Sequence, residues 1–232
     1  MLVALEHPNL VRIYDVEQVD RLNFLVLERV DGCDLHEIVR KGGPLPAIRV
    51  AHYGRQAALV LQHLWDHGVV HRNISHDHLL LDRSGTIKLI GLSVAFTNNP
   101  EFQIPPNHGQ GGEVVVSPDF TAPEQAVDCF QVDCRADIYA LGATLYFCLT
   151  GRAPFPEGTV AELIWHRTRW PVPTGDFRSD VPEALIGVIN RMMQKDPAQR
   201  YQSPSKVVEA LKAWTATPIP PPSREEMPAA EL

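Results

Sequence analysis

Residues 71–79 read His71-Arg72-Asn73-Ile74-Ser75-His76-Asp77-His78-Leu79, a polar segment set between short apolar runs. Val69-Val70 precedes it, and residues 79–81 and 87–90 follow it as further apolar runs. Asp82-Arg83-Ser84-Gly85 separates the last two, and these residue types favour turns. Short apolar runs bounded by turns are typical of buried strands. The pattern predicts a polar loop held among short strands.

Outside this loop, the sequence predicts a strand hairpin followed mainly by helices. Residues 10–16 and 22–28 are apolar-rich and flank a short polar connection, which indicates two paired strands. Apolar residues at helical spacing, with Pro46 near the start and Gly68 just past the end, predict a helix over residues 46–67. Further helices are predicted over residues 34–41, 136–150, 159–168, 182–194 and 203–215.

The composition indicates a globular protein that does not bind nucleic acid. Of the 232 residues, 44% are hydrophobic and 21% are charged, which are ordinary globular values. The formal charge of −7 and the lack of a Lys/Arg run disfavour nucleic-acid partners. Residues 215–232 differ, because five prolines follow Thr217 and few residues there can repay the entropy of ordering. We expect residues 215–232 to form a disordered Pro-rich tail.

The cysteines and the apolar runs predict a cytoplasmic protein without a membrane segment. The four cysteines form no C-x-x-C pair, which favours free thiols in a reducing compartment. The N-terminus lacks the basic and apolar regions of a signal peptide. The longest apolar run covers residues 138–149, too short to span ~30 Å of hydrocarbon, and indicates a buried core helix.

Several spaced motifs together resemble the bacterial serine/threonine protein kinase domain. Residues 71–79 resemble its catalytic loop, and Ile90-Gly91-Leu92-Ser93 stands where the family carries Asp-Phe-Gly. The other motifs are Glu6-His7-Pro8-Asn9-Leu10-Val11, Ala122-Pro123-Glu124, Asp137-Ile138-Tyr139-Ala140-Leu141-Gly142, and two C-terminal stretches, Leu149–Phe155 and Asp196–Tyr201.

The resemblance implies an α+β protein-kinase-like fold. We expect residues 1–31 to form a partial N-lobe with a two-strand sheet and the hinge. Residues 32–214 would form a mostly helical C-lobe, and residues 215–232 the tail.

The resemblance also implies that the catalytic positions hold unsuitable residues. Asn73 replaces the aspartate that accepts the substrate proton, and an amide is a very poor base. Ser75 replaces the lysine that neutralises the γ-phosphate. His78 and Gly91 replace the magnesium-holding asparagine and aspartate, although Mg²⁺ prefers oxygen ligands.

The scaffold positions of the family are filled. His71 and Arg72 remain in the loop, and Asp137 stands where the family's buried aspartate bonds the loop backbone. Glu124 and Arg200 occupy the positions of the C-lobe ion pair. Leu27, Glu28 and Val30 align with the adenine-contacting hinge, where we expect weak nucleotide binding or none.

The Gly-rich loop, strand lysine and helix glutamate of the family would all precede His7, so we expect an N-terminally truncated N-lobe. Two explanations stay open. Either the sequence is a fragment, or another chain covers the bare edge of the two-strand sheet.

These residues predict a pseudokinase that acts by binding protein partners, with no cofactor expected. ATP and Mg²⁺ would bind only in a cleft that still functions. Two alternatives remain, a nucleotide-binding sensor and a serine/threonine kinase with residual activity.

Two further motifs have structural interpretations. We interpret the cluster of His71, His76, Asp77 and His78 as a degenerate loop rather than a metal site. Residues 109–112 are interpreted as a flexible loop rather than a phosphate loop.

Overall fold

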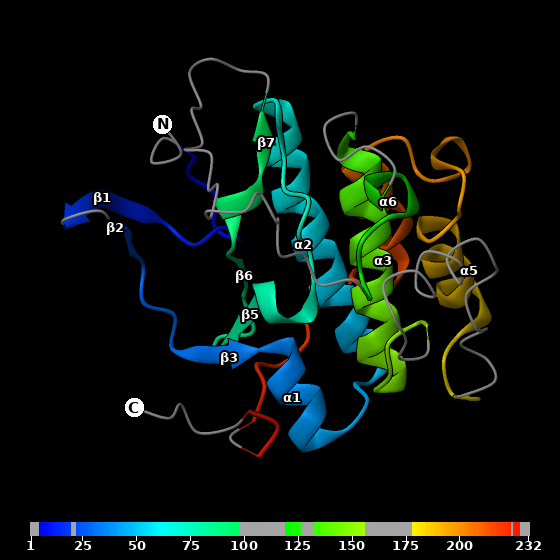
Figure 1. Cartoon of the computed structure of the whole chain (residues 1–232). Coiled ribbons are helices and arrows are strands. Elements are labelled where there is room, and N and C mark those ends of the chain that lie inside the picture. Colours follow the sequence, from blue (N-terminus) through cyan, green and yellow to red (C-terminus); the bar gives the residue numbers. More distant parts are fainter. Residues whose placement is uncertain are drawn as a thin grey trace.

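The computed structural model describes residues 5–19, 22–97, 119–126, 132–155, 178–223 and 225–227, and it has the predicted α+β architecture (Figure 1). The strands are β1 (Ile13–Val19), β2 (Leu22–Leu27), β3 (Gly32–Asp34), β4 (Val69–Val70), β5 (Leu79–Asp82), β6 (Ile87–Leu89) and β7 (Phe96–Thr97). The helices are α1 (Leu35–Gly42), α2 (Ala47–Asp66), α3 (Cys134–Thr150), α5 (Glu183–Met192) and α6 (Pro204–Ala210). The helix predicted over residues 159–168 and the loop at 109–112 lie outside the described residues.

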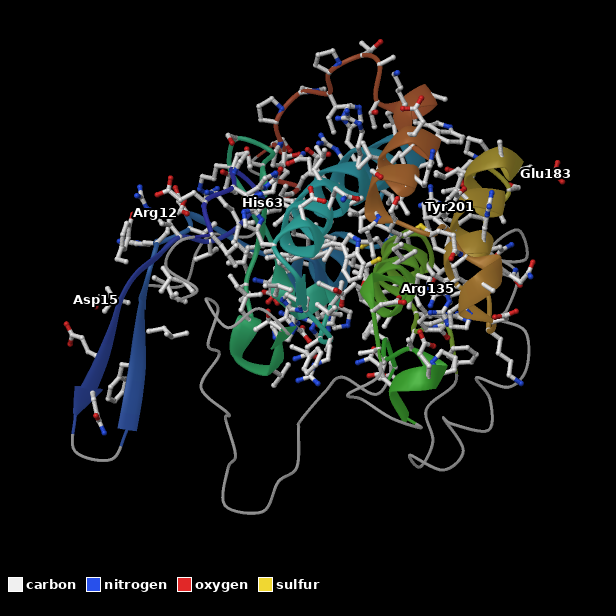
Figure 2. All side chains as sticks on the ribbon, turned by 90° about the horizontal axis from the view of Figure 1, so that it is seen from above. Arg12, Asp15, His63, Arg135, Glu183 and Tyr201 are labelled. Atoms are coloured by element: carbon white, nitrogen blue, oxygen red, sulfur yellow. The ribbon has the colours of Figure 1, made fainter. Side chains whose placement is uncertain are left out.

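Strands β1 and β2 form the predicted antiparallel hairpin, which projects away from the helices (Figures 1 and 2). The register pairs Val16 with Leu25 and Val19 with Leu22. Several large apolar side chains on this hairpin are exposed, and Phe24 and Leu25 keep 48% and 45% of their surface. The hairpin therefore contributes little to the core.

The segment before β1 is fastened to β6. The Val11 amide donates to the Leu89 carbonyl, and the Leu89 amide donates to the Asn9 carbonyl, at 2.9 and 2.8 Å. The Asn9 side-chain amide donates to the Ile87 carbonyl at 2.8 Å. Because Asn9 bonds β6 through both its backbone carbonyl and its side-chain amide, it fixes where the chain approaches the hairpin.

The core is built around α3, which is buried along nearly its whole length. The apolar run predicted to be a core helix lies within it. Helix α2 packs against α3 so closely at Gly54 that an added Cβ would lie 2.7 Å from Leu145 Cδ1. Helices α5 and α6 also pack on α3 (Figure 1). This bundle supports the small β3-β5-β6 sheet and the loop between β4 and β5.

Strand β3 was not anticipated from the sequence. It pairs antiparallel with β5, and Cys33 faces Leu81 across the pair. Only three residues long, it has no apolar alternation to reveal it. It leads directly into α1, whose first turn is capped by the Asp34 carboxylate accepting from the Glu37 amide at 2.7 Å.

The prediction of disorder after residue 215 is wrong for the described part of the tail. The Arg49 guanidinium donates to the Pro220 carbonyl at 3.2 Å and to the Glu226 carboxylate at 3.0 Å. Met227 is buried, and Ile219 packs against the core. The composition of residues 215–232 could not predict this, because composition gives only the average polarity of a segment. Two apolar side chains and one arginine are enough to anchor these residues to the core.

None of the helices within the described ranges is long and apolar enough to cross a membrane.

Candidate active site

Asp137 of α3 holds the backbone of the loop between β4 and β5. The backbone amides of His71 and Arg72 donate to the two Asp137 carboxylate oxygens, both at 2.8 Å. Burial raises the pKa of Asp137 to about 7, while the two amide donors favour its charged form. The buried carboxylate therefore fixes the loop backbone at its first two residues.

The His71 ring is fully buried beneath the loop and satisfies both ring nitrogens locally. Its Nε2 lies 2.9 Å from the Ile90 carbonyl, and its Nδ1 accepts from the Asn73 amide at 3.3 Å. These contacts suit a neutral ring with the proton on Nε2. Burial lowers the pKa of His71 to about 3, in agreement with that neutral form.

Arg72 adopts a left-handed backbone conformation, with φ of 66°, which is unusual for a residue with a side chain. Its guanidinium donates to the Val94 carbonyl at 2.8 Å and lies over the Phe96 ring at 5.5 Å. The Gln125 side chain donates to the Arg72 carbonyl at 2.9 Å. Arg72 thus ties the loop to the segments on either side of the undescribed residues 98–118.

The predicted ion pair between Glu124 and Arg200 forms. Arg200 is buried, and its two terminal nitrogens each donate to one oxygen of the Glu124 carboxylate. Its remaining N–H groups donate to three backbone carbonyls, and the guanidinium stacks over Tyr139 at 4.8 Å. All five donors of the guanidinium are satisfied, so the charge is buried without an orphaned hydrogen.

Gly91 and His78 are packed against each other on the cleft side of the loop. Gly91 is left-handed, with φ of 88°, and a Cβ added there would lie 2.4 Å from His78 Cδ2. His78 Nδ1 lies 3.1 Å from the hydroxyl of the buried Ser75. The His78 ring therefore occupies the volume into which a side chain at position 91 would project.

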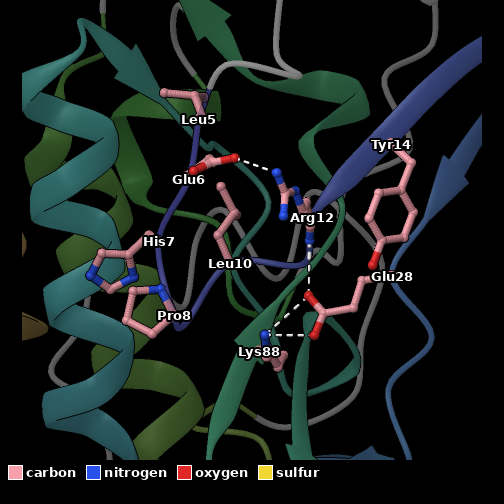
Figure 3. Close-up of a pocket in the computed structure, with 9 residues that line it drawn as sticks. All are labelled: Leu5, Glu6, His7, Pro8, Leu10, Arg12, Tyr14, Glu28 and Lys88. Atoms are coloured by element: carbon pink, nitrogen blue, oxygen red, sulfur yellow. Dashed lines mark hydrogen bonds and ion pairs between the residues drawn. The ribbon is translucent and has the colours of Figure 1, made fainter.

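The hinge residues Leu27, Glu28 and Val30 do not converge on one site. The Glu28 carboxylate accepts from Lys88 Nζ at 2.7 and 3.0 Å and from the Arg12 amide at 3.1 Å (Figure 3). Partial burial opposes ionisation, but the hydrogen bonds from Lys88 and Arg12 hold the pKa of Glu28 below its ordinary value. Val30 is half-buried.

Two pockets lie on either side of the chain as it enters β1. One, of about 410 Å³, has a mixed polar and apolar lining that includes the Glu28–Lys88 pair and Tyr14 (Figure 3). The other, of about 210 Å³, is apolar and is lined by Leu10, Val11, Ile13, Leu25, Leu27, Leu89, Ile90, Gly91 and Leu92. The second pocket joins Leu27 of the hinge to Gly91 of the cleft.

The sequence of the chain matches the family described as "Protein kinase domain" over residues 1–212. The chain belongs to the protein kinase family. It is 34% identical over 227 residues to the serine/threonine-protein kinase Pkn1 of Myxococcus xanthus, which covers 96% of this chain and 32% of that relative. It is 31% identical over 204 residues to a probable serine/threonine-protein kinase of Clostridium acetobutylicum, covering 88% of this chain and 30% of the relative. The chain thus spans about a third of the length of these relatives.

Protein kinases surround the transferred phosphoryl group with a base, cations and metal-holding oxygens. The residues expected at those positions from the sequence motifs are Asn73, Ser75, His78 and Gly91. The sites for Mg²⁺ offer an imidazole already close to Ser75 and a glycine whose Cβ space is filled. Since neither position offers a carboxylate oxygen, these residues do not fit a hard Mg²⁺ ion.

Sequence reasoning missed three residues that shape this kinase-family site. Lys88 neutralises Glu28, Gln125 holds the loop at Arg72, and His36 of α1 lies beside His76 of the loop. Nothing in their local sequence patterns singles them out, because each acts across the fold.

Proposed function

We propose that this chain is a non-catalytic member of the protein kinase family that acts by binding another protein. The observation that carries the proposal is the side chains at the four chemical positions, Asn73, Ser75, His78 and Gly91. The tight packing of His78 on Gly91 supports it, because a lone substitution at either position would not rebuild an oxygen-lined metal site.

The chemistry explains why these replacements matter together. Phosphoryl transfer depends on positioning and on neutralising negative charge, and removing one electrostatic group typically costs about 10²–10³ in rate. Asn73 supplies no base, and Ser75 supplies no positive charge. With the metal positions changed as well, little remains that would stabilise the transition state.

The exposed hairpin supports a protein partner. Phe24, Leu25, Val26 and Leu27 follow one another along β2, so apolar side chains are exposed on both faces of the strand, each with 39–48% of its surface. Tyr14 of β1 is 56% exposed. A large apolar surface next to an unpaired strand edge is a feature of protein-binding sites.

Phosphoryl transfer by the purified chain tests the catalytic half of the proposal. With radiolabelled ATP, Mg²⁺ or Mn²⁺ and a generic protein substrate, we expect no transfer above that of the Asn73→Ala variant. Transfer that the Asn73→Ala change abolishes would overturn the proposal.

Partner capture tests the binding half. A Phe24→Ser, Leu27→Ser double variant should lose a specifically captured protein, while Ile48→Ser, which alters a residue 42% exposed on α2, should retain it. Equal capture by both variants would exclude the hairpin as the binding surface.

A second candidate function is nucleotide sensing without catalysis. The apolar pocket that joins Leu27 to Gly91 favours it, because a purine ring suits such a lining. A thermal-shift measurement with millimolar ATP in EDTA separates the two functions. Stabilisation by ATP without a metal would support the sensor, and no shift would argue against it.

A further inference from the structure

Three metal-ligating side chains from two separate segments meet beside the loop. His36 comes from the first turn of α1, and His76 and Asp77 come from the 3-10 turn His76–His78. Asp77 Oδ1 lies 3.3 Å from His36 Nδ1 and 2.9 Å from His76 Nδ1. All three ligand atoms lie within 4.8 Å of one another.

We propose that His36, His76 and Asp77 bind a zinc ion. Ligands at the usual Zn–N and Zn–O distances of about 2.0–2.2 Å stand roughly 3.3 Å apart in a tetrahedron. The two separations from Asp77 are close to that value. Three protein ligands leave the fourth position to water or to a group from a partner protein.

The His76 ring gives an independent reason to place a cation here. Its Nδ1 atom is buried and lies 2.9 Å from the Asp77 carboxylate oxygen, but outside good hydrogen-bond geometry. A proton on Nδ1 would pair poorly with the carboxylate in this geometry, whereas a metal ion could accept the lone pairs of both atoms. A bound metal ion would satisfy both atoms at once.

The surroundings of the cluster suit a zinc site. The His76 ring packs against Phe120 and Phe147, with ring centres 4.6 and 4.4 Å away, and it stacks on His36 at 4.5 Å. These rings would fix the orientation of the ligand and keep water from one side. The side chains of His36 and Asp77 are 48% and 46% exposed, which leaves a path for the ion.

The ligand set also selects the class of metal. Two imidazoles and one carboxylate suit Zn²⁺ and similar borderline ions, whereas Mg²⁺ and Ca²⁺ prefer all-oxygen sites. The other loop histidines do not take part, because His71 contacts Ile90 and His78 contacts Ser75. A bound ion would add a metal link between α1 and the loop to the existing 3.3 Å contact of His36 with Asp77.

Zinc titration of the chelator-treated full chain tests the proposal. Isothermal calorimetry with Zn²⁺ alone should give one ion per chain, and Co²⁺ should give the visible absorption of a tetrahedral site. Loss of an outer-shell partner already weakens metal binding about 10–100-fold, so His36→Ala and Asp77→Asn should each weaken it at least ~10-fold. Excess Mg²⁺ should not compete.

His67→Ala is the matched control, because the His63 and His67 rings lie 4.4 Å apart on α2 and offer a competing pair. This variant should bind zinc as the wild type does. Unaltered zinc affinity in His36→Ala, loss of binding in His67→Ala, or no binding by the wild type would each overturn the proposal. Thermal unfolding without metal should match in all variants, and zinc should raise the midpoint of the wild type but not of His36→Ala.

Discussion

Two regions of the molecule contact the loop between β4 and β5, and they differ in the charges they carry. Beneath the loop, Asp137 is buried and bonded to two backbone amides, and nearby Arg200 is buried against Glu124. On the cleft side, Asn73, Ser75 and Gly91 carry no charge at all. Buried charges hold the backbone of the loop, whereas these three positions on its other side carry none.

The comparison teaches that folding and phosphoryl transfer place separable demands on this fold. A buried ion must keep every partner, since removing one leaves an uncompensated charge. A catalytic group must instead match its charge and pKa to the reacting atoms, a demand that folding alone does not make. If the two regions differ in this way, substitutions beneath the loop should cost more folding free energy than substitutions in the cleft.

The largest effect is expected from breaking the Glu124–Arg200 pair. Arg200→Ala leaves Glu124 without its partner and frees three backbone carbonyls, so unfolding free energy should fall by about 3–5 kcal/mol. Urea denaturation measures the change. Lys212→Ala removes a cation from an exposed pair with Glu209 and should change stability by less than about 1 kcal/mol. A similar loss of unfolding free energy in both variants would mean that the buried charge of Arg200 stabilises the fold no more than the exposed charge of Lys212.

A second test asks whether position 91 in the cleft can accommodate a side chain. Gly91→Asp places a Cβ against His78 and a side chain at φ of 88°, so it should cost about 1–3 kcal/mol. Adding His78→Asn removes the ring and should recover much of that loss. A double-mutant cycle by urea denaturation gives the coupling. Additive losses would show that the two positions are independent.

The third test uses pH to probe the ring beneath the loop. Burial lowers the pKa of His71 to about 3, so the unfolded chain binds its proton first as pH falls through the ordinary value of 6.5. Stability from this residue is therefore complete above pH 6.5 and is lost toward pH 3. The raised pKa of Asp137, about 7, acts in the opposite direction over much of the same range.

Comparing variants isolates the His71 contribution. In His71→Gln, the dependence of unfolding free energy on pH should lose a slope of up to about 1.4 kcal/mol per pH unit between pH 6 and pH 4. The half-buried His52, whose pKa burial also lowers, gives a control, and His52→Gln should change the slope less. An unchanged slope in His71→Gln would mean that the ring takes up its proton at the same pH in the folded and the unfolded chain.

The sequence predicted the elements that depend on local pattern. The β1–β2 hairpin, α2 with its flanking Pro46 and Gly68, and the buried α3 all form as expected, with small differences at their ends. The contact of Asp137 with the loop was also anticipated, but through family resemblance rather than through periodicity.

What the sequence did not reveal are contacts between distant segments. Strand β3 forms because β5 lies beside it and pairs with it. The described part of the tail is ordered because Arg49 and the core contact it. The pairing of His36 with Asp77 likewise depends on how α1 leaves β3. Local composition carries no information about such partners, so these features emerge only in three dimensions.

The smallest effect should come from the cleft itself. Asn73→Asp exchanges an amide for a carboxylate of almost the same shape on a half-buried residue. Because the volume is conserved and the residue is not fully buried, we expect the unfolding free energy to change by less than about 1 kcal/mol. Urea denaturation of Asn73→Asp and Arg200→Ala under the same conditions compares the two losses of stability directly. A loss approaching that of Arg200→Ala would mean that Asn73 is retained for folding, and position 73 would then belong with the scaffold rather than with the cleft.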